Sequence, residues 1–429
     1  MAFPSWLQHV STDLHDRRTL YIILTAPIIG FYAYRTITGL LNTTQGRNTA
    51  PIIPSPRKPL RLLSAEDLSQ ISYPPDALPG VRDVDTPYGN IRVYEWGPES
   101  GRKVLFIHGI STPCIAFASI AKMLVEQHGC RVMLFDLFGR GYSDAPDPEA
   151  FPQDLRLFTT QIMLVLGSSE LAWTGREGRF ALVGYSLGGG VAAGFTSYFP
   201  DMVDSLVLLA PGGLIRAKHI SASSKLLYGG LLPKALVEYF IYRRIGGGKQ
   251  PEARSKTRDH KTSGESETTL VEAAKSETPA HPALAKDSAA PLFPDRPSVS
   301  PAHAVGWQVD AHPGFLASFI SSIQHAPITN QHERWRIIGR RLSAQKLLEC
   351  HEGESAKKNG KVLVLLGETD SVIVPDETGE DAKEVLGEGN VDVQVLEGGH
   401  DFPVANAKGT VKAMVEFWDE ESGRGLLRG

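Results

Sequence analysis

Short apolar segments with the length of β-strands alternate with segments of helical spacing through much of this chain, and this constrains its fold most strongly. The expected strands are Asn90–Trp96, Lys103–His108, Arg131–Asp136, Phe180–Tyr185, Ser205–Ala210, Lys361–Leu366 and Val391–Leu396. The expected helices are Pro113–His128, Asp154–Leu171, Leu187–Phe199 and Val404–Trp418. Apolar strands separated by helices are typical of a mostly parallel sheet covered on both faces. We therefore predict an α/β fold.

The alternation stops between Pro211 and Lys361. The two ends of this stretch, His219–Ile245 and His312–Leu348, have helical patterns. Residues 247–300 are rich in Lys, Glu, Ser, Thr, Ala and Pro, and such a composition buries too little apolar surface to order itself. We expect a helical insertion over 212–350 that contains a disordered loop at 247–300, and a core made of 81–211 and 351–429.

The N-terminal region, residues 1–41, contains an uncharged apolar run from Thr19 to Tyr34. Extended to about 19–41, it is long enough for a membrane-spanning helix, although a buried helix of the globular domain is the alternative. Residues 42–80 read as a Pro-rich linker. Basic residues are more numerous after the run (Arg35, Arg47, Arg57, Lys58, Arg61) than before it (Arg17, Arg18). By the positive-inside rule we expect a protein anchored in membrane lipid through this helix, with the rest of the chain in the cytosol.

Charge and cysteine content exclude some classes of function. The formal net charge is −4, which argues against a general electrostatic grip on nucleic acid. The three cysteines, Cys114, Cys130 and Cys350, do not have the spacing of metal ligands. We expect no metal, no organic cofactor and no nucleic-acid partner.

The motif Gly184-Tyr185-Ser186-Leu187-Gly188 is the strongest indication of chemistry. A Gly-x-Ser-x-Gly sequence alone is weak evidence, but here it follows an apolar strand and opens a helix, which is the context of a nucleophile elbow. Flanking glycines allow the tight, strained turn that holds the serine hydroxyl clear of the backbone. Ser186 is therefore the candidate nucleophile.

A serine hydroxyl needs a base, and the base needs a group that fixes its tautomer. His400 follows the last expected strand in a Gly-rich loop, where open α/β sheets place their sites. Asp370 follows the strand before and is the candidate acid, with Asp376 and Glu368 as alternatives. We expect Asp401, next to the histidine, to be a solvated neighbour.

An oxyanion hole needs two convergent N–H donors. Leu187, directly after the candidate nucleophile, lies at the start of a helix, where backbone N–H groups are unpaired. Ile110, in the loop after the strand that ends at His108-Gly109, is the second candidate. We expect His108 to shape that turn.

Several motifs, in this order, resemble those of the α/β-hydrolase superfamily. They are His108-Gly109, the segment Asp136–Asp144, Gly184–Gly188, Gly367–Asp370 and Gly399-His400. The resemblance implies an eight-stranded sheet, a helical cap at 212–350 and a structural turn at Asp136–Asp144. Epoxide hydrolases and haloalkane dehalogenases of this superfamily use an Asp nucleophile, so Ser186 disfavours those activities. The anchored layout is similar to that of monoacylglycerol lipases with an N-terminal anchor.

These observations predict a serine hydrolase that cleaves carboxylic esters through an acyl-enzyme on Ser186. We expect lipophilic, acylglycerol-like esters as the small-molecule substrates. An acyltransferase or a carbon–carbon bond hydrolase could use the same residues. The alternative from another class is a non-catalytic, membrane-tethered scaffold, in which the three side chains would not converge.

Overall fold

A computed structural model gives the structure of most of the chain. It describes residues 51–60, 62–69, 71–219, 227–229, 232–245, 290–293, 296, 299–352 and 360–421, together with Gly30 and Ala33. All elements named below belong to one unit, Pro51–Gly429.

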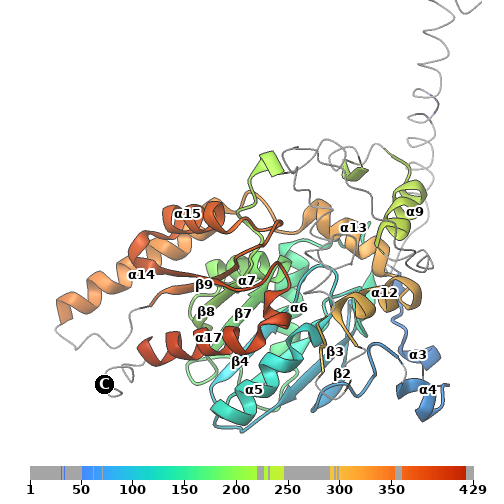
Figure 1. Cartoon of the computed structure of the whole chain (residues 1–429), viewed down its shortest axis with the longest axis horizontal. Helices are drawn as coiled ribbons and strands as arrows, with labels where there is room; N and C mark the ends of the chain where they lie inside the picture. The colour runs from blue at the N-terminus through green and yellow to red at the C-terminus, as the bar shows by residue number, and fades with distance from the viewer. Residues whose placement is uncertain are drawn as a thin grey trace, which may run out of the picture. The chain divides into compact units, whose positions relative to one another are not determined.

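An eight-stranded sheet forms the centre of this unit (Figure 1). Across the sheet, the strands are β10 (Val391–Leu396), β9 (Val362–Gly367), β8 (Val203–Leu209), β7 (Phe180–Tyr185), β4 (Lys103–Ile107), β5 (Arg131–Phe135), β3 (Gly89–Trp96) and β2 (Val81–Thr86). Neighbouring strands run parallel from β10 to β5, whereas β3 pairs antiparallel with β5 and β2. The predicted α/β fold with a mostly parallel eight-stranded sheet is confirmed.

Burial along the strands follows their place in the sheet. Every residue of β7 and β9 is buried, as expected for central strands covered on both faces. In β2, exposed and half-buried residues alternate, because it lies at the edge. The buried strands hold the loops at their carboxyl ends, which carry the candidate site.

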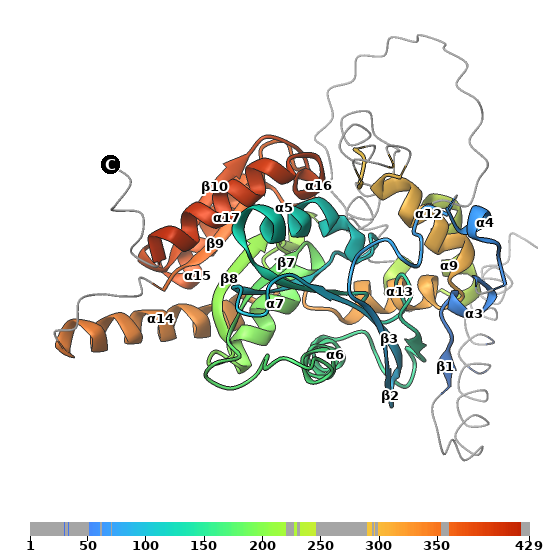
Figure 2. The same ribbon diagram turned by 90° about the horizontal axis from the view of Figure 1, so that it is seen from below.

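Two groups of helices cover the sheet (Figure 2). The first contains α5 (Ala118–His128), preceded by the short helix η1 (Cys114–Phe117), together with α16 (Phe402–Ala405) and α17 (Ala407–Glu421). The second contains α6 (Leu155–Gly167), α7 (Leu187–Tyr198), α14 (His332–Glu352) and α15 (Pro375–Leu386), which is followed by η3 (Glu388–Asn390). Asp154 begins α6 by accepting the N–H groups of Arg156 and Leu157, a typical N-cap.

The insertion between β8 and β9 contributes the cap helices η2 (Ala217–His219), α9 (Lys234–Ile245), α12 (Pro301–Ala311) and α13 (Phe315–His325). The last helix of the insertion, α14, instead packs on α7 and α15. Of the loop expected to be disordered at 247–300, residues 247–289 lie outside the described residues. Its end differs from the expectation, because Leu292, Phe293 and Val299 are buried in the hydrophobic core.

The segment expected to be a Pro-rich linker packs against the core from residue 51 onward. Strand β1 (Ile52–Ile53) pairs with β6 (Ala145–Pro146), and two short helices follow, α3 (Arg57–Leu60) and α4 (Ala65–Ser69). Tyr73 is fully buried, and its hydroxyl donates to Asp136 at 3.0 Å. Apolar and aromatic side chains among the prolines therefore tie this segment down.

The expected localisation at a membrane is wrong on the evidence of the structure. Within the part of the chain that the structure describes, no helix has both the length and the apolar character needed to cross a bilayer. The segment at about 19–41 lies outside the described residues, apart from Gly30 and Ala33.

Candidate active site

Ser186 lies in a strained turn between β7 and α7. Its φ of 54° and ψ of −120° are values that a residue with a side chain rarely adopts. The turn requires glycine on both sides of it. A Cβ at Gly184 would lie 2.3 Å from the carbonyl oxygen of Gly188, and one at Gly188 would lie 2.1 Å from that of Ile107. The backbone thus stores strain at the one serine that the motif singles out.

The structure brings Ser186, His400 and Asp370 together in a chain of hydrogen bonds. The Oγ of Ser186 lies 3.0 Å from Nε2 of His400, and Nδ1 of His400 lies 2.8 Å from Oδ2 of Asp370. His400 follows β10 and Asp370 follows β9, so neighbouring parallel strands place both groups at one edge. All three residues are buried.

Backbone N–H groups hold the second oxygen of Asp370. Its Oδ1 accepts hydrogen bonds from Val372 at 2.8 Å and Ile373 at 2.9 Å. The carboxylate is thereby fixed with Oδ2 facing the histidine. The alternative acids, Glu368 and Asp376, are exposed.

Asp401 differs from the expectation of a solvated neighbour. It is 2% exposed, and its Oδ1 accepts the hydroxyl proton of Tyr185 at 2.7 Å. The ring of Tyr185 also packs against that of His400, with centroids 5.4 Å apart. This pair joins the residue before Ser186 to the residue after His400.

Ile110 and Leu187 both line a pocket that contains Ser186. Within the described residues, neither backbone N–H has a hydrogen-bond acceptor. Leu187 is the first residue of α7, so the positive end of the helix dipole also faces this point. Ile110 and Leu187 therefore stay candidates for the two N–H donors that an oxyanion hole requires.

His108 holds the loop that carries Ile110. Its Nδ1 lies 2.8 Å from the carbonyl oxygen of Gly109, and its Nε2 accepts the N–H of Leu137 at 2.9 Å. Burial lowers the pKa of His108 to about 3, so the ring is neutral and Nδ1 is the donor. Because a peptide unit is planar and trans, fixing the carbonyl of Gly109 also fixes the opposite direction of the Ile110 N–H.

The pocket at Ser186 is aliphatic and small. The other lining side chains are those of Ile215, Ile323, Ile328, Val372 and Ile373. The cavity measures about 10 Å³, which is space for one water molecule. The sequence pattern did not identify these side chains, because only Ile323 lies on a helix and the other four lie in connecting segments, whose side-chain directions hydrophobic spacing does not give.

A charged cluster lies next to this pocket, in a second pocket that shares Ile215, Val372 and Ile373 with it. Arg216 binds Asp381 through two contacts of 2.9 Å, and His219 lies 2.7 Å from Glu377. These contacts connect the start of the cap to α15. Salt bridges therefore border the aliphatic pocket on the side of α15.

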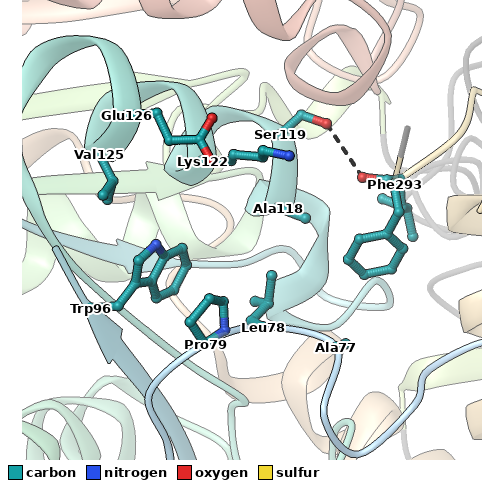
Figure 3. A pocket seen from close by; sticks show the side chains of 11 residues that line it. Ala77, Leu78, Pro79, Trp96, Ala118, Ser119, Lys122, Val125, Glu126 and Phe293 are labelled. Atoms are coloured by element: carbon teal, nitrogen blue, oxygen red, sulfur yellow. Dashed lines mark hydrogen bonds between the residues drawn. The ribbon is translucent and has the colours of Figure 1, made fainter. Parts of the chain in front are cut away.

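A larger pocket of about 340 Å³ lies elsewhere, between α5 and the segment before β2 (Figure 3). Trp96, Pro79 and Leu78 line one side of it, and Lys122 and Glu126 lie on the other. Ser119 donates to the carbonyl oxygen of Leu292 at 3.3 Å at its edge. No candidate catalytic residue lines this pocket.

The described residues contain no group of three or more His, Cys, Asp or Glu side chains that could hold a metal ion.

Comparisons with known proteins give a consistent result. The model of a family described as "alpha/beta hydrolase fold" matches residues 103–404. A "Serine hydrolase-like protein" of Danio rerio is 33% identical over 132 residues, which are 30% of this chain and 37% of the relative. The "sn-1-specific diacylglycerol lipase ABHD11" of Mus musculus is 33% identical over 124 residues, covering 28% of this chain and 36% of the relative. These matches thus span little more than a third of either relative.

Solved structures share the fold at low sequence identity. The crystal structure of a putative lipase from Acinetobacter baumannii AYE aligns with a TM-score of 0.50 and 15% identity. The alignment covers 80% of this chain and 93% of that one. This similarity supports the fold.

Proposed function

Since the chain belongs to the α/β-hydrolase fold family, as the match over residues 103–404 shows, we propose that it is a serine hydrolase that cleaves carboxylic esters through an acyl-enzyme on Ser186. One observation carries this proposal, the chain of hydrogen bonds from Ser186 through His400 to Asp370. The scaffold alternative requires these side chains to lie apart, so the observed distances argue against it.

In the first step, Nε2 of His400 accepts the proton of the Ser186 hydroxyl while Oγ attacks the ester carbonyl carbon. The imidazole becomes an imidazolium, which the carboxylate of Asp370 stabilises. The two backbone N–H groups that donate to Oδ1 of Asp370 keep the carboxylate oriented during this change. The carbonyl π-bond breaks, and its electron pair moves to the oxygen.

The N–H groups of Ile110 and Leu187 then donate to the tetrahedral oxyanion. Each preorganised donor of this kind is worth about 3–4 kcal/mol of transition-state stabilisation. When the intermediate collapses, His400 protonates the leaving alcohol and the acyl group remains on Ser186. Water repeats the sequence on the acyl-enzyme, releases the carboxylic acid and restores the serine.

The lining of the pocket indicates the substrate class. Apart from Ser186, the pocket presents aliphatic side chains and backbone, so an apolar acyl group matches it and a charged one does not. The diacylglycerol lipase among the relatives acts on such esters, as its name states. We propose lipophilic, acylglycerol-like esters as substrates. Because the cavity is close to the size of one water molecule, side chains that line it must move to admit such a substrate.

A fluorophosphonate probe and a panel of esters of increasing acyl length test this proposal. We expect wild type to be labelled, and Ser186→Ala to lose labelling and at least about 10⁴-fold in kcat. The control is Ser197→Ala, which removes a buried hydroxyl at the far end of α7, the helix that begins directly after Ser186. This variant should behave as wild type. Equal labelling of Ser186→Ala would refute the role of Ser186.

The same panel tests the substrate class, and added alcohol tests the competing reaction. Rates that rise with acyl length support lipophilic esters, whereas a preference for acetyl esters contradicts them. An ester product formed at the expense of the free acid when alcohol is added would identify an acyltransferase instead.

A further inference from the structure

The carbonyl groups of Ile110 and Ser111, which follow the Ile110 N–H along the chain, both accept hydrogen bonds from side chains of distant segments. The carbonyl oxygen of Ile110 accepts a hydrogen bond from Nε of Arg140 at 3.0 Å. The carbonyl oxygen of Ser111 accepts one from Nε2 of Gln308 at 2.7 Å. We call residues 109–111 the oxyanion loop, because Ile110 is a proposed oxyanion donor.

Both of these side chains are tied to the cap. Gln308 belongs to cap helix α12, and its Oε1 accepts the N–H of Gly141 at 2.7 Å. Arg140 lies in the turn after β5, and its Nη2 donates to Oγ of Ser322, on cap helix α13, at 2.8 Å. Its Nη1 donates to the carbonyl oxygen of Phe138 at 3.1 Å. The helices α12 and α13 pack on each other and lie close together in both views (Figures 1 and 2).

These contacts are fully buried, since Arg140, Gln308 and Ser322 have no exposed surface. Breaking one of these hydrogen bonds would leave a buried polar group with neither a protein partner nor water, which is energetically unfavourable. The contacts are therefore expected to persist. The planar guanidinium reaches three acceptors from fixed positions, which the single ammonium of a lysine does not reproduce. The oxyanion loop is therefore connected rigidly to two helices of the cap.

We propose that Arg140, Gln308 and Ser322 form a clamp that positions the Ile110 N–H for the oxyanion, so that the seated cap completes the active site. None of the three touches the reacting atoms; they are positioning residues. Ile323, next to Ser322, lines the pocket at Ser186. One helix thus contacts the acyl group and supports the oxyanion loop, which links the fit of the substrate to the alignment of the donor. This inference rests on the proposed function.

The substitution Ser322→Ala tests the clamp with little change in shape. The matched control is Ser321→Ala, which removes a neighbouring buried hydroxyl whose partner is the N–H of Gln153, at 3.0 Å, outside the oxyanion loop. Because misplacement of a catalytic group by about 1 Å can cost about 10²-fold, we expect kcat to fall about 5- to 20-fold in Ser322→Ala with KM within twofold of wild type. Affinity for a trifluoromethyl ketone, which forms a tetrahedral oxyanion on serine, should fall by the same factor.

A second readout does not depend on catalysis. Amide hydrogen exchange of a peptide that contains residues 109–111 should quicken in Ser322→Ala and in Gln308→Ala, and stay at the wild-type rate in Ser321→Ala. Equal losses of kcat and equal exchange in Ser322→Ala and Ser321→Ala would overturn the clamp. If wild type shows no esterase activity, the proposed function fails, while the exchange rates still decide whether the cap holds the loop.

Discussion

A single hydroxyl links the two loops that carry Ser186 and His400. Tyr185 and Asp401 are each adjacent in sequence to one of these residues, and their side chains meet in the protein interior at 2.7 Å. A hydrogen bond to a buried carboxylate is worth about 1.5–3 kcal/mol. The bond therefore ties the residue before the nucleophile to the residue after the base.

Tyr185→Phe should lower both stability and rate. We expect the free energy of unfolding to fall by about 1–3 kcal/mol, because the buried carboxylate of Asp401 loses a donor. Urea denaturation measures the first effect, and ester hydrolysis should show a lower kcat with little change in KM. In a double-mutant cycle with Asp401→Ala, which removes the acceptor, additive losses would contradict a direct coupling.

For single residues, the sequence predicts which ones belong to the candidate site better than it predicts the direction of their side chains. Ser186 and His400 follow from their place after strands, and the structure brings them into contact. The prediction that Asp401 is solvated was wrong, because its adjacency to His400 does not show which way its carboxylate points. Arg140 and Gln308 carry no sequence signal for their contacts, since their partners lie on distant segments.

Among the elements, apolar strands are predicted well and polar ones poorly. β7 has the residues Phe180–Tyr185 that its apolar pattern predicts. β2 was not predicted from the pattern, because most of its residues are polar, among them Arg82, Asp83 and Asp85, and its pairing with β3 is a tertiary contact. Helix α15 has a similarly polar sequence and is positioned by packing on β9 and β10.

Two glycines in helices should respond in opposite ways to alanine. Gly306, within α12, has nothing within 4 Å of the place where a Cβ would lie, so Gly306→Ala should stabilise the protein by about 0.5–1 kcal/mol. Gly188→Ala would set its Cβ 2.1 Å from the carbonyl oxygen of Ile107 and should give a markedly lower melting temperature and loss of esterase activity. Thermal unfolding measures the change in melting temperature of both variants. A stable and active Gly188→Ala would contradict the close approach of Gly188 to the carbonyl oxygen of Ile107.

For the molecule as a whole, two buried histidines predict how stability depends on pH. Burial lowers the pKa of His108 to about 3 and that of His312 to about 4, from an ordinary value of 6.5. In each ring one nitrogen accepts a backbone N–H, from Leu137 and Gly314 respectively, and a proton there would oppose that donor. At these two sites the unfolded chain therefore binds more protons than the folded protein between about pH 6.5 and 4. Glu421 acts in the opposite direction, because burial raises its pKa to about 7 and the folded protein holds the proton there down to about pH 4.5.

The two histidines each lower the free energy of unfolding by up to about 1.4 kcal/mol per pH unit as the pH drops below 6.5, and Glu421 offsets one of these contributions down to about pH 4.5. We therefore expect a net fall in the free energy of unfolding below pH 6.5. Urea denaturation at a series of pH values measures this slope. His312→Gln should reduce this slope by the contribution of one proton, up to about 1.4 kcal/mol per pH unit, even where the variant is less stable throughout. A slope that is the same in His312→Gln and wild type would contradict the buried, neutral state of His312.

The place of the cap in the chain has a kinetic consequence. β8 ends at Leu209 and its partner β9 begins at Val362, so their pairing closes a loop that contains the entire insertion. The entropic barrier to closing such a loop is on the order of 4 kcal/mol, and contacts of high sequence separation form slowly. Asp370 and His400 lie beyond this closure, whereas Ser186 lies before it. We therefore expect the serine to gain its base only in the last stage of folding, when the two parts of the sheet join.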